Sequence, residues 1–377
     1  ISLFKGSIII IWACMPFTWY LGFRWYGLPR DYCVLLGLLT LCIHDPYNVG
    51  FGIRSSTFKG LYTQHFGLFF LPLFVGSFAQ MLQSAKKSTL NTAILFSLTA
   101  MSHLWVGLYA AIIALSLSIS QFPSTKNHYQ KLLAFSFFVF ILLAWWILPL
   151  LITNDYAGGL PWLRSFQNGW VWYNIFGNFF TGEIFDHSRL PVLTVLCTIG
   201  CFIHVFSFRH PFVRHWLILT LFTGILFLGR TNLGALYNFI PMHSQVNVMR
   251  YITGIHICGL FTITTALWFF IQIIMMCNQK IGSCIALFLS TFVLVFGSLD
   301  IKSTTKLFDA KNPSYSSLIH YLRQLPDHRF IVHKNLGTGN HFHRDLLPLY
   351  TNKGQVQSYA HGFHCTLSTY YAEYFDF

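Results

Sequence analysis

The chain has 377 residues, of which 54% are hydrophobic, 18% are aromatic and only 9% are charged. An ordinary soluble domain contains about 25% charged residues, so the composition excludes a typical soluble enzyme, and the apolar content excludes a disordered chain. The formal net charge is +13, yet no basic stripe is present that could follow a nucleic-acid backbone. We therefore expect an all-α polytopic membrane protein with no nucleic-acid partner, because lipid-exposed backbone groups must be satisfied within helices.

Apolar runs near the length of a membrane helix, about 20 residues, recur through residues 1–299. We expect about ten membrane segments, at about 2–20, 32–43, 62–82, 90–102, 104–121, 131–153, 190–208, 213–228, 250–277 and 281–299. The 32–43 run is too short to span alone and is expected to be re-entrant or extended at Asp45-Pro46. The 90–121 stretch is either one long helix or two short helices broken at Ser102-His103.

Basic residues in the short connections set the expected orientation, because Lys and Arg concentrate on the cytoplasmic side. The dense set comprises Arg24, Arg30, Lys86, Lys87, Lys126, Lys131, Arg209, Arg214 and Lys280. The alternate connections, at about 44–61, 154–189 and 229–249, contain fewer basic residues and are expected outside. This alternation works only if 90–121 crosses twice, with His103 at the outer turn. The chain then begins outside without a signal peptide, so we expect truncation at both ends relative to the gene product.

The composition becomes polar from about residue 300. We expect residues 1–299 to form the transmembrane domain and 300–377 to form a small, incomplete extracytoplasmic α/β domain. A capped amphipathic helix is predicted around 317–322 and a short strand at 330–332. His341-Phe342-His343 is compatible with metal binding, but the ligand spacing matches no structural site, so we predict no metal centre.

The first outer connection carries His44-Asp45, followed by Tyr62 and His65. A carboxylate beside an imidazole at a membrane mouth is suited to act as a general base or to bind a cation. The structural alternative is an Asp-Pro helix terminator followed by a solvated loop.

The second outer connection holds Asp155 and a tryptophan-rich stretch that includes Trp162. Aromatic residues at this depth usually form an interfacial belt, and they also suit stacking on sugar rings. Asp155 and Trp162 are therefore candidate substrate-binding residues, with the belt as the alternative.

The third outer connection holds Arg230 and His243 and ends at Arg250, where a long apolar run begins. An arginine near a helix end usually extends to the lipid headgroups. An arginine that points inward is suited to a phosphate, since its planar fork binds two oxygens. His103 stands between apolar stretches, where a hydrogen-bonded structural role is the alternative to substrate binding.

Several motifs occur in a characteristic order along the chain. They are Leu61 to Gly67 with Leu71-Pro72-Leu73, Ser102-His103-Leu104, Gly182 to Thr194, Gly229-Arg230 to Pro241 with Arg250-Tyr251, and an outer tail with Ser317 to Val332 and Tyr370-Tyr371. In this order the chain resembles a bacterial integral-membrane glycosyltransferase of the GT-C class, and more narrowly the subset labelled 6-pyruvoyl-tetrahydropterin-synthase-related membrane proteins.

The resemblance implies transfer of a sugar from a polyprenyl-phosphate donor to an acceptor at the outer face of a bacterial inner membrane. The family's catalytic acid usually lies in the first outer loop, which places it upstream of Ile1, so Asp45 with His44 is a substitute candidate. Arg250 matches the family's basic residue at the lipid phosphate, and His103 matches its hairpin histidine. No cofactor is required by the resemblance, and a divalent cation stays open.

Two other functions stay open. One is a transporter or flippase for a lipid-linked or anionic solute, although no inverted repeat or mid-membrane charge is visible in the sequence. The other is a non-catalytic subunit of a membrane complex, with the outer tail as a docking module.

Overall fold

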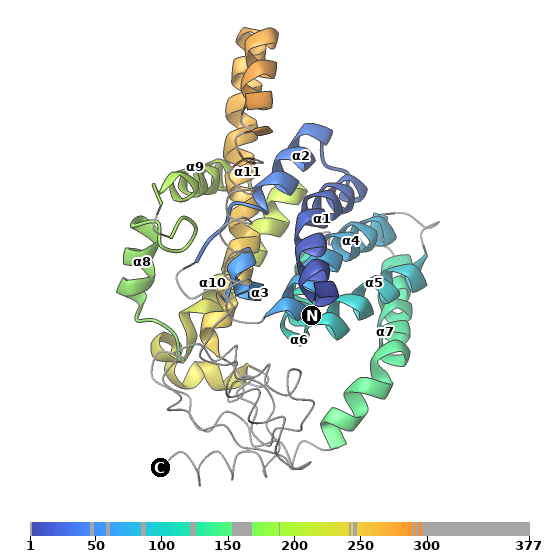
Figure 1. Ribbon diagram of the computed structural model, residues 1–377. Coiled ribbons are helices and arrows are strands. Elements are labelled where there is room, and N and C mark those ends of the chain that lie inside the picture. The colour runs from blue at the N-terminus through green and yellow to red at the C-terminus, as the bar shows by residue number, and fades with distance from the viewer. Residues whose placement is uncertain are drawn as a thin grey trace.

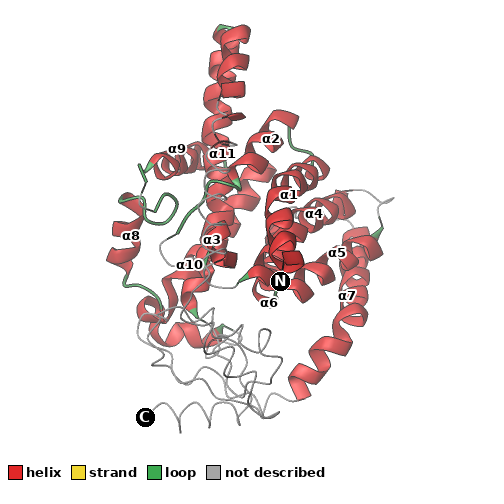
Figure 2. Cartoon of the chain, in the orientation of Figure 1, coloured by secondary structure: helices red, strands yellow, loops and turns green. Residues whose placement is uncertain are grey.

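The computed structural model describes residues 2–45, 49–57, 61–83, 88–120, 126–152, 168–187, 189–240, 243, 247–288, 290, 291, 293 and 295. These ranges consist of helices and their connections, without a strand (Figure 2). The predicted all-α membrane domain is confirmed to that extent. The expected α/β domain over 300–377 and the candidates Asp155 and Trp162 lie outside the described residues.

Most helices follow the predicted apolar runs, whereas the short helices α3 and α8 lie in stretches predicted as outer connections (Figure 1). In chain order they are α1 (Ser2–Tyr26), α2 (Arg30–Leu39), α3 (Ile53–Thr57), α4 (Tyr62–Gln83), α5 (Thr89–Ser102), α6 (Leu104–Ser120), α7 (Lys126–Ile152), α8 (Trp172–Phe180), α9 (Val192–Phe206), α10 (Pro211–Leu233), the short 3-10 helices η3 (Gly234–Phe239) and η5 (Val248–Tyr251), and α11 (Ile252–Cys277). Helical residues resume over 279–288.

Five helical stretches in the described ranges are long and apolar enough to cross a membrane. They are Gly6–Tyr26, Tyr62–Gln83, Tyr129–Pro149, Pro211–Phe239 and Val248–Cys277. Shorter apolar helices occur at Thr89–Ser102, Leu104–Ser120 and Val192–Phe206. The long helices indicate a multi-pass integral membrane protein, while the number of about ten segments stays a prediction.

Small residues bring helix backbones into direct contact, as is common between membrane helices. A Cβ atom added to Gly22 of α1 would lie 2.2 Å from the carbonyl oxygen of Pro72 in α4. A Cβ atom on Gly200 of α9 would lie 1.8 Å from the carbonyl oxygen of Thr262 in α11. Any larger side chain at these positions must separate the two helices.

The 90–121 stretch consists of two helices, as the charge alternation required. α5 ends at Ser102, His103 has extended backbone angles (φ −161°, ψ 119°), and α6 begins at Leu104. The Tyr109 hydroxyl donates to the Tyr251 carbonyl at 3.0 Å, so the start of α6 meets the start of α11. At the other end of α6, the Arg214 guanidinium of α10 donates to the Ser120 carbonyl. α6 therefore runs from the start of α11 to the start of α10.

The chain is irregular in two places beside α11, after the end of α2 and between α8 and α9. α2 ends at Leu39, and the chain continues through the buried residues 40–45. α8 and α9, which lie on one side of α11 (Figure 1), are separated by the connection 181–191. The two irregular connections meet where the His44 N–H donates to the Phe185 carbonyl at 3.1 Å. Irregular backbone inside a membrane protein is tolerated when protein covers it.

Candidate functional site

The candidate residues fall into two groups, which we call the loop cluster and the arginine cluster. The loop cluster surrounds the contact between the connection after α2 and the connection between α8 and α9. It comprises His44, Asp45, Gln64, His65, Asp186, Arg189 and His256. The arginine cluster lies where α6, α10 and α11 come together and comprises His103, Arg230, Tyr237, His243, Arg250 and Tyr251.

The Asp45 carboxylate organises its own loop. Its side chain is only 3% exposed, and its two oxygens accept the backbone N–H groups of Val49 at 3.2 Å and Gly50 at 3.0 Å. These contacts give the carboxylate a structural role, because it satisfies buried donors, but the described part of this loop is mostly buried and not solvated as the structural alternative supposed. His44 is also buried, and its backbone N–H donates to the connection between α8 and α9. The catalytic role predicted for these two residues stays a prediction.

His256 joins three segments and was not anticipated from the sequence. The Phe51 N–H donates to its Nδ1 at 3.0 Å, and its Nε2 lies 2.7 Å from the Ile184 carbonyl. Because Nδ1 accepts, the proton must be on Nε2, so the imidazole is held neutral in one tautomer. The one signal in the sequence was a histidine inside the apolar run 250–277, which does not reveal its partners.

His65 and Gln64 hold the same loop from α4. His65 Nε2 donates to the Phe51 carbonyl at 3.1 Å, while its Nδ1 faces the Ser56 hydroxyl. Gln64 Nε2 donates to the Gly50 carbonyl at 2.7 Å. Both ring nitrogens of His65 are thus bound by protein. Its predicted substrate contact remains untested, as does that of Tyr62, which begins α4.

Asp186 and Arg189 satisfy backbone groups around the connection between α8 and α9. The Asp186 carboxylate accepts the backbone N–H groups of Leu193 at 3.0 Å and Thr194 at 2.9 Å, together with the Thr194 hydroxyl at 2.9 Å. It therefore caps α9 and places a negative charge at the positive end of the helix dipole. The Arg189 guanidinium donates to the carbonyls of Asp186, Phe185 and Cys42. The charges of Asp186 and Arg189 thus serve backbone groups.

Arg230 is held firmly in the arginine cluster. Its guanidinium donates to Asn168 Oδ1 at 3.0 Å and to the His243 carbonyl at 2.7 Å, and it lies 5.3 Å from the centre of the Tyr237 ring. The structure therefore brings together two of the predicted residues, Arg230 and His243. These contacts use much of the hydrogen-bonding capacity of Arg230 and leave mainly its charge.

Arg250 is placed differently. It belongs to η5, immediately before α11, and it is half-buried. Within the described part of the chain, its guanidinium has neither a hydrogen bond nor an ion pair with another side chain. Beside it is His103, whose Nδ1 is buried and lacks a hydrogen-bond partner among the described residues. Burial, reinforced by the positive charge of Arg250, lowers the pKa of His103 to about 3, so the imidazole is neutral near pH 7.

Two phenol groups complete this cluster. The hydroxyls of Tyr237 and Tyr251 are buried, lie near each other, and make no hydrogen bond of normal geometry with a described residue. The Trp105 ring packs on Tyr251 with a centroid distance of 5.1 Å. Buried polar atoms usually have partners, so an imidazole, a guanidinium and two hydroxyls with unused capacity in one place indicate a site for a polar ligand.

The electrostatics of the arginine cluster favour an anion. The described residues include the carboxylates of Asp31, Asp45, Glu183 and Asp186, and the ion pair formed among them joins Glu183 to His187. No described carboxylate pairs with the cluster's two arginines. The same ranges contain no group of three or more histidine, cysteine or acidic residues that could hold a metal ion.

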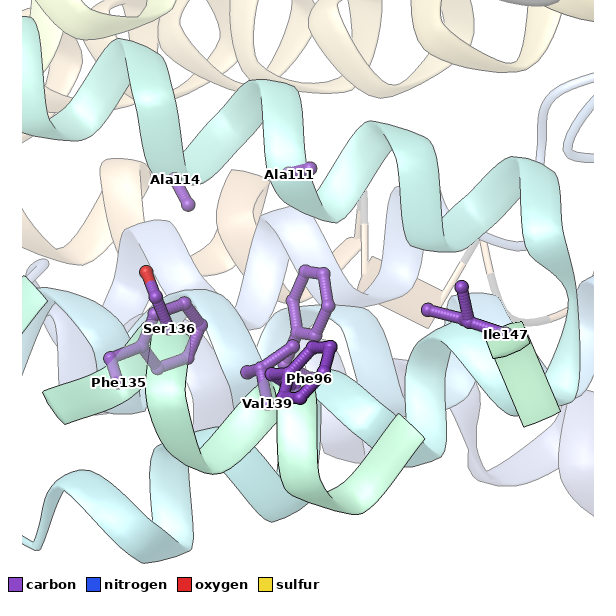
Figure 3. Close-up of a pocket in the computed structure, with 8 residues that line it drawn as sticks. Phe96, Ala111, Ala114, Phe135, Ser136, Val139 and Ile147 are labelled. Carbon is purple, nitrogen blue, oxygen red and sulfur yellow. The ribbon is translucent and has the colours of Figure 1, made fainter. Parts of the chain in front are cut away.

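An apolar groove lies elsewhere in the fold, between α5, α6 and α7 (Figure 3). It encloses about 370 Å³. Its lining is apolar apart from one serine and consists of Phe96, Ala111, Ala114, Phe135, Ser136, Val139, Phe140 and Ile147. The groove offers no charge to a ligand, so it is suited to hydrocarbon and not to the anion that the arginine cluster would hold.

No protein-family model, no curated protein and no solved structure matches this chain. The likeness to GT-C glycosyltransferases therefore rests on the order of motifs in the sequence. The two clusters differ in how many of their polar groups have protein partners. In the loop cluster the polar groups are engaged with protein, whereas the arginine cluster has polar groups to spare.

Proposed function

We propose that the protein is a GT-C-type membrane glycosyltransferase that moves a sugar from a polyprenyl-phosphate donor to an acceptor, with the arginine cluster holding the phosphate. One observation carries the proposal. The Arg250 guanidinium has no partner among the described side chains and lies beside a neutral His103 whose Nδ1 is also unused. A phosphate would supply acceptors for the guanidinium and for the tyrosine hydroxyls.

This arrangement suits a phosphate that becomes a leaving group. As the bond between sugar and phosphate breaks, negative charge grows on the phosphate oxygens. A donor fork already in place stabilises that charge without reorganising. Arg230, fixed by Asn168 and His243, adds positive charge nearby. Arg250 would therefore lower the energy of the transition state more than that of the bound donor.

Binding of undecaprenyl phosphate to the detergent-purified protein tests the phosphate site directly. Two charge-assisted hydrogen bonds contribute about 1.5–3 kcal/mol each, so Arg250→Ala should weaken binding by at least about 100-fold. The matched control is Arg209→Ala, because Arg209 is exposed in the connection between α9 and α10. Equal affinities of wild type and Arg250→Ala would remove Arg250 from the site.

Turnover provides a second, independent test. Arg250→Ala should abolish sugar transfer from polyprenyl-phosphate donors while the protein still elutes as a folded species in size-exclusion chromatography. Chelation of divalent cations in the same assay shows whether sugar transfer requires a divalent cation. Unchanged transfer by Arg250→Ala would contradict the mechanism.

A transporter for a lipid-linked or anionic solute is the second candidate. It is favoured by the two irregular connections that meet at His44 and Phe185, since many transporters use non-helical chain at the substrate site. Against it, Asp45, Asp186 and His256 are bound to backbone groups there. Flux of an intact lipid-linked sugar across proteoliposomes would favour the transporter, and co-purification of other membrane chains would favour the subunit role.

A further inference from the structure

The described residues contain one carboxylate–imidazole pair that the phosphate site does not use. Glu183 Oε2 lies 2.6 Å from His187 Nδ1, and the two residues are four positions apart in the connection between α8 and α9. Their side chains are 37% and 27% exposed, respectively. The nearby carboxylates of Asp45 and Asp186 are 3% and 2% exposed. Glu183 is thus the accessible acid of this region.

The pair stands on a rigid base beside α11. The Ile184 carbonyl accepts from His256 at 2.7 Å, and the Phe185 ring lies 5.7 Å from the His256 ring. His256 is six residues beyond Arg250 on the same helical stretch, which corresponds to roughly 9 Å along the axis. The turn that carries the pair is therefore attached to α11 less than two helical turns from Arg250.

We propose that His187, oriented by Glu183, is the general base that deprotonates the acceptor hydroxyl. This inference rests on the proposed glycosyltransferase function. With Nδ1–H donated to Glu183 Oε2, the Nε2 lone pair is available to take a proton, and the carboxylate stabilises the imidazolium that forms.

The step balances without a further reactant. The acceptor hydroxyl gives its proton to His187 Nε2, and its oxygen forms a bond to the anomeric carbon of the donor sugar. The bond between that carbon and the phosphate oxygen breaks, and the electron pair leaves with the polyprenyl phosphate. His187 then returns the proton to water, so the enzyme is unchanged.

Other ionisable groups around this turn are committed to backbone contacts. On the turn itself, Asp186 caps α9 and Arg189 donates to carbonyl groups. From the facing segments, His256 is bonded through both nitrogens, and Asp45 accepts from its own loop. The fifth group, His44, is buried. Asp45, Asp186, His44 and His256 are buried, whereas Glu183 and His187 are partly exposed.

The test uses Glu183→Gln and His187→Gln in the full chain, with His210→Gln as the matched control, because His210 is exposed in the connection between α9 and α10. One readout is binding of undecaprenyl phosphate. The other is release of polyprenyl phosphate from undecaprenyl-phosphate-linked glucose or mannose, followed across pH. General-base catalysis contributes about 10²–10⁴-fold, so kcat of His187→Gln should fall by that factor, with KM unchanged and the acidic limb of the pH profile lost.

Glu183→Gln should lower kcat less than His187→Gln and shift the same limb, and neither variant should change phosphate binding. Wild-type turnover in both variants would overturn the assignment of His187 while leaving the glycosyltransferase proposal intact. Loss of undecaprenyl phosphate binding in both would also overturn it, because the pair would then be structural. Absence of wild-type turnover and binding would overturn the function together with this inference.

Discussion

Replacing Asp186 tests the claim that the charges of the loop cluster are structural. The Asp186 carboxylate is 2% exposed and accepts two backbone N–H groups of the first turn of α9. Asp186→Ala leaves both donors without this partner, and each buried unsatisfied donor costs about 1–3 kcal/mol. The expected loss is therefore about 2–6 kcal/mol. Asp186→Asn keeps one acceptor oxygen and should lose about half as much.

The matched control is Asp31→Ala, because Asp31 is exposed in the first turn of α2. Such surface changes usually stay within about 0.5 kcal/mol. Thermal unfolding in detergent, followed by size-exclusion chromatography, should lower Tm of Asp186→Ala by about 4–12 °C, at roughly 2 °C per kcal/mol for a large domain. If Asp186→Ala unfolds at the same temperature as Asp31→Ala, the capping role is wrong. If Asp186→Asn keeps its Tm but loses turnover, the carboxylate acts on substrate.

Two further substitutions probe packing and protonation. Gly200→Ala forces a Cβ to 1.8 Å from the Thr262 carbonyl and should cost about 1–3 kcal/mol, whereas Gly224→Ala, with no atom within 4 Å, should be neutral or stabilising in the same melting assay. An equal effect of both would refute the close contact. The pKa of His103 falls from 6.5 to about 3 on folding, so its contribution to stability is complete above pH 6.5 and is lost as pH falls toward 3. Between pH 6.5 and 3, Tm of His103→Gln should therefore fall less than Tm of the wild type. If Tm of both proteins falls equally with pH, His103 is not held neutral.

The helices could be predicted because their signal is local. Apolar runs and the alternation of basic connections placed α4, α6 and α11 within a few residues, and they separated α5 from α6 at His103. The interruption after Leu39 was foreseen only as a run too short to span. The conformation of residues 40–45 depends on groups that arrive much later in the chain, and hydrophobic periodicity carries no signal of them.

The sequence could predict which residue types form the candidate sites, but not which of their polar groups are hydrogen-bonded to protein. The sequence already favoured Arg250 over Arg230 for the phosphate, but it gave no sign that Asn168 and His243 hold Arg230. A histidine in an apolar run does not reveal whether protein occupies both of its nitrogens, as at His256. Glu183 and His187 stand four positions apart in the chain, and that spacing was the available hint of their pairing.

The contact between the two irregular connections, which follow α2 and α8, constrains how the protein is made. The loop after α2 depends on His256, which lies 205 residues beyond Phe51. At about 5–20 residues per second, a ribosome needs about 10–40 s to supply that partner. Until then the polar groups of this loop lack their hydrogen-bond partners, and such groups are not tolerated in contact with lipid tails. The connection after α2 can therefore reach its final conformation only after α11 has been made.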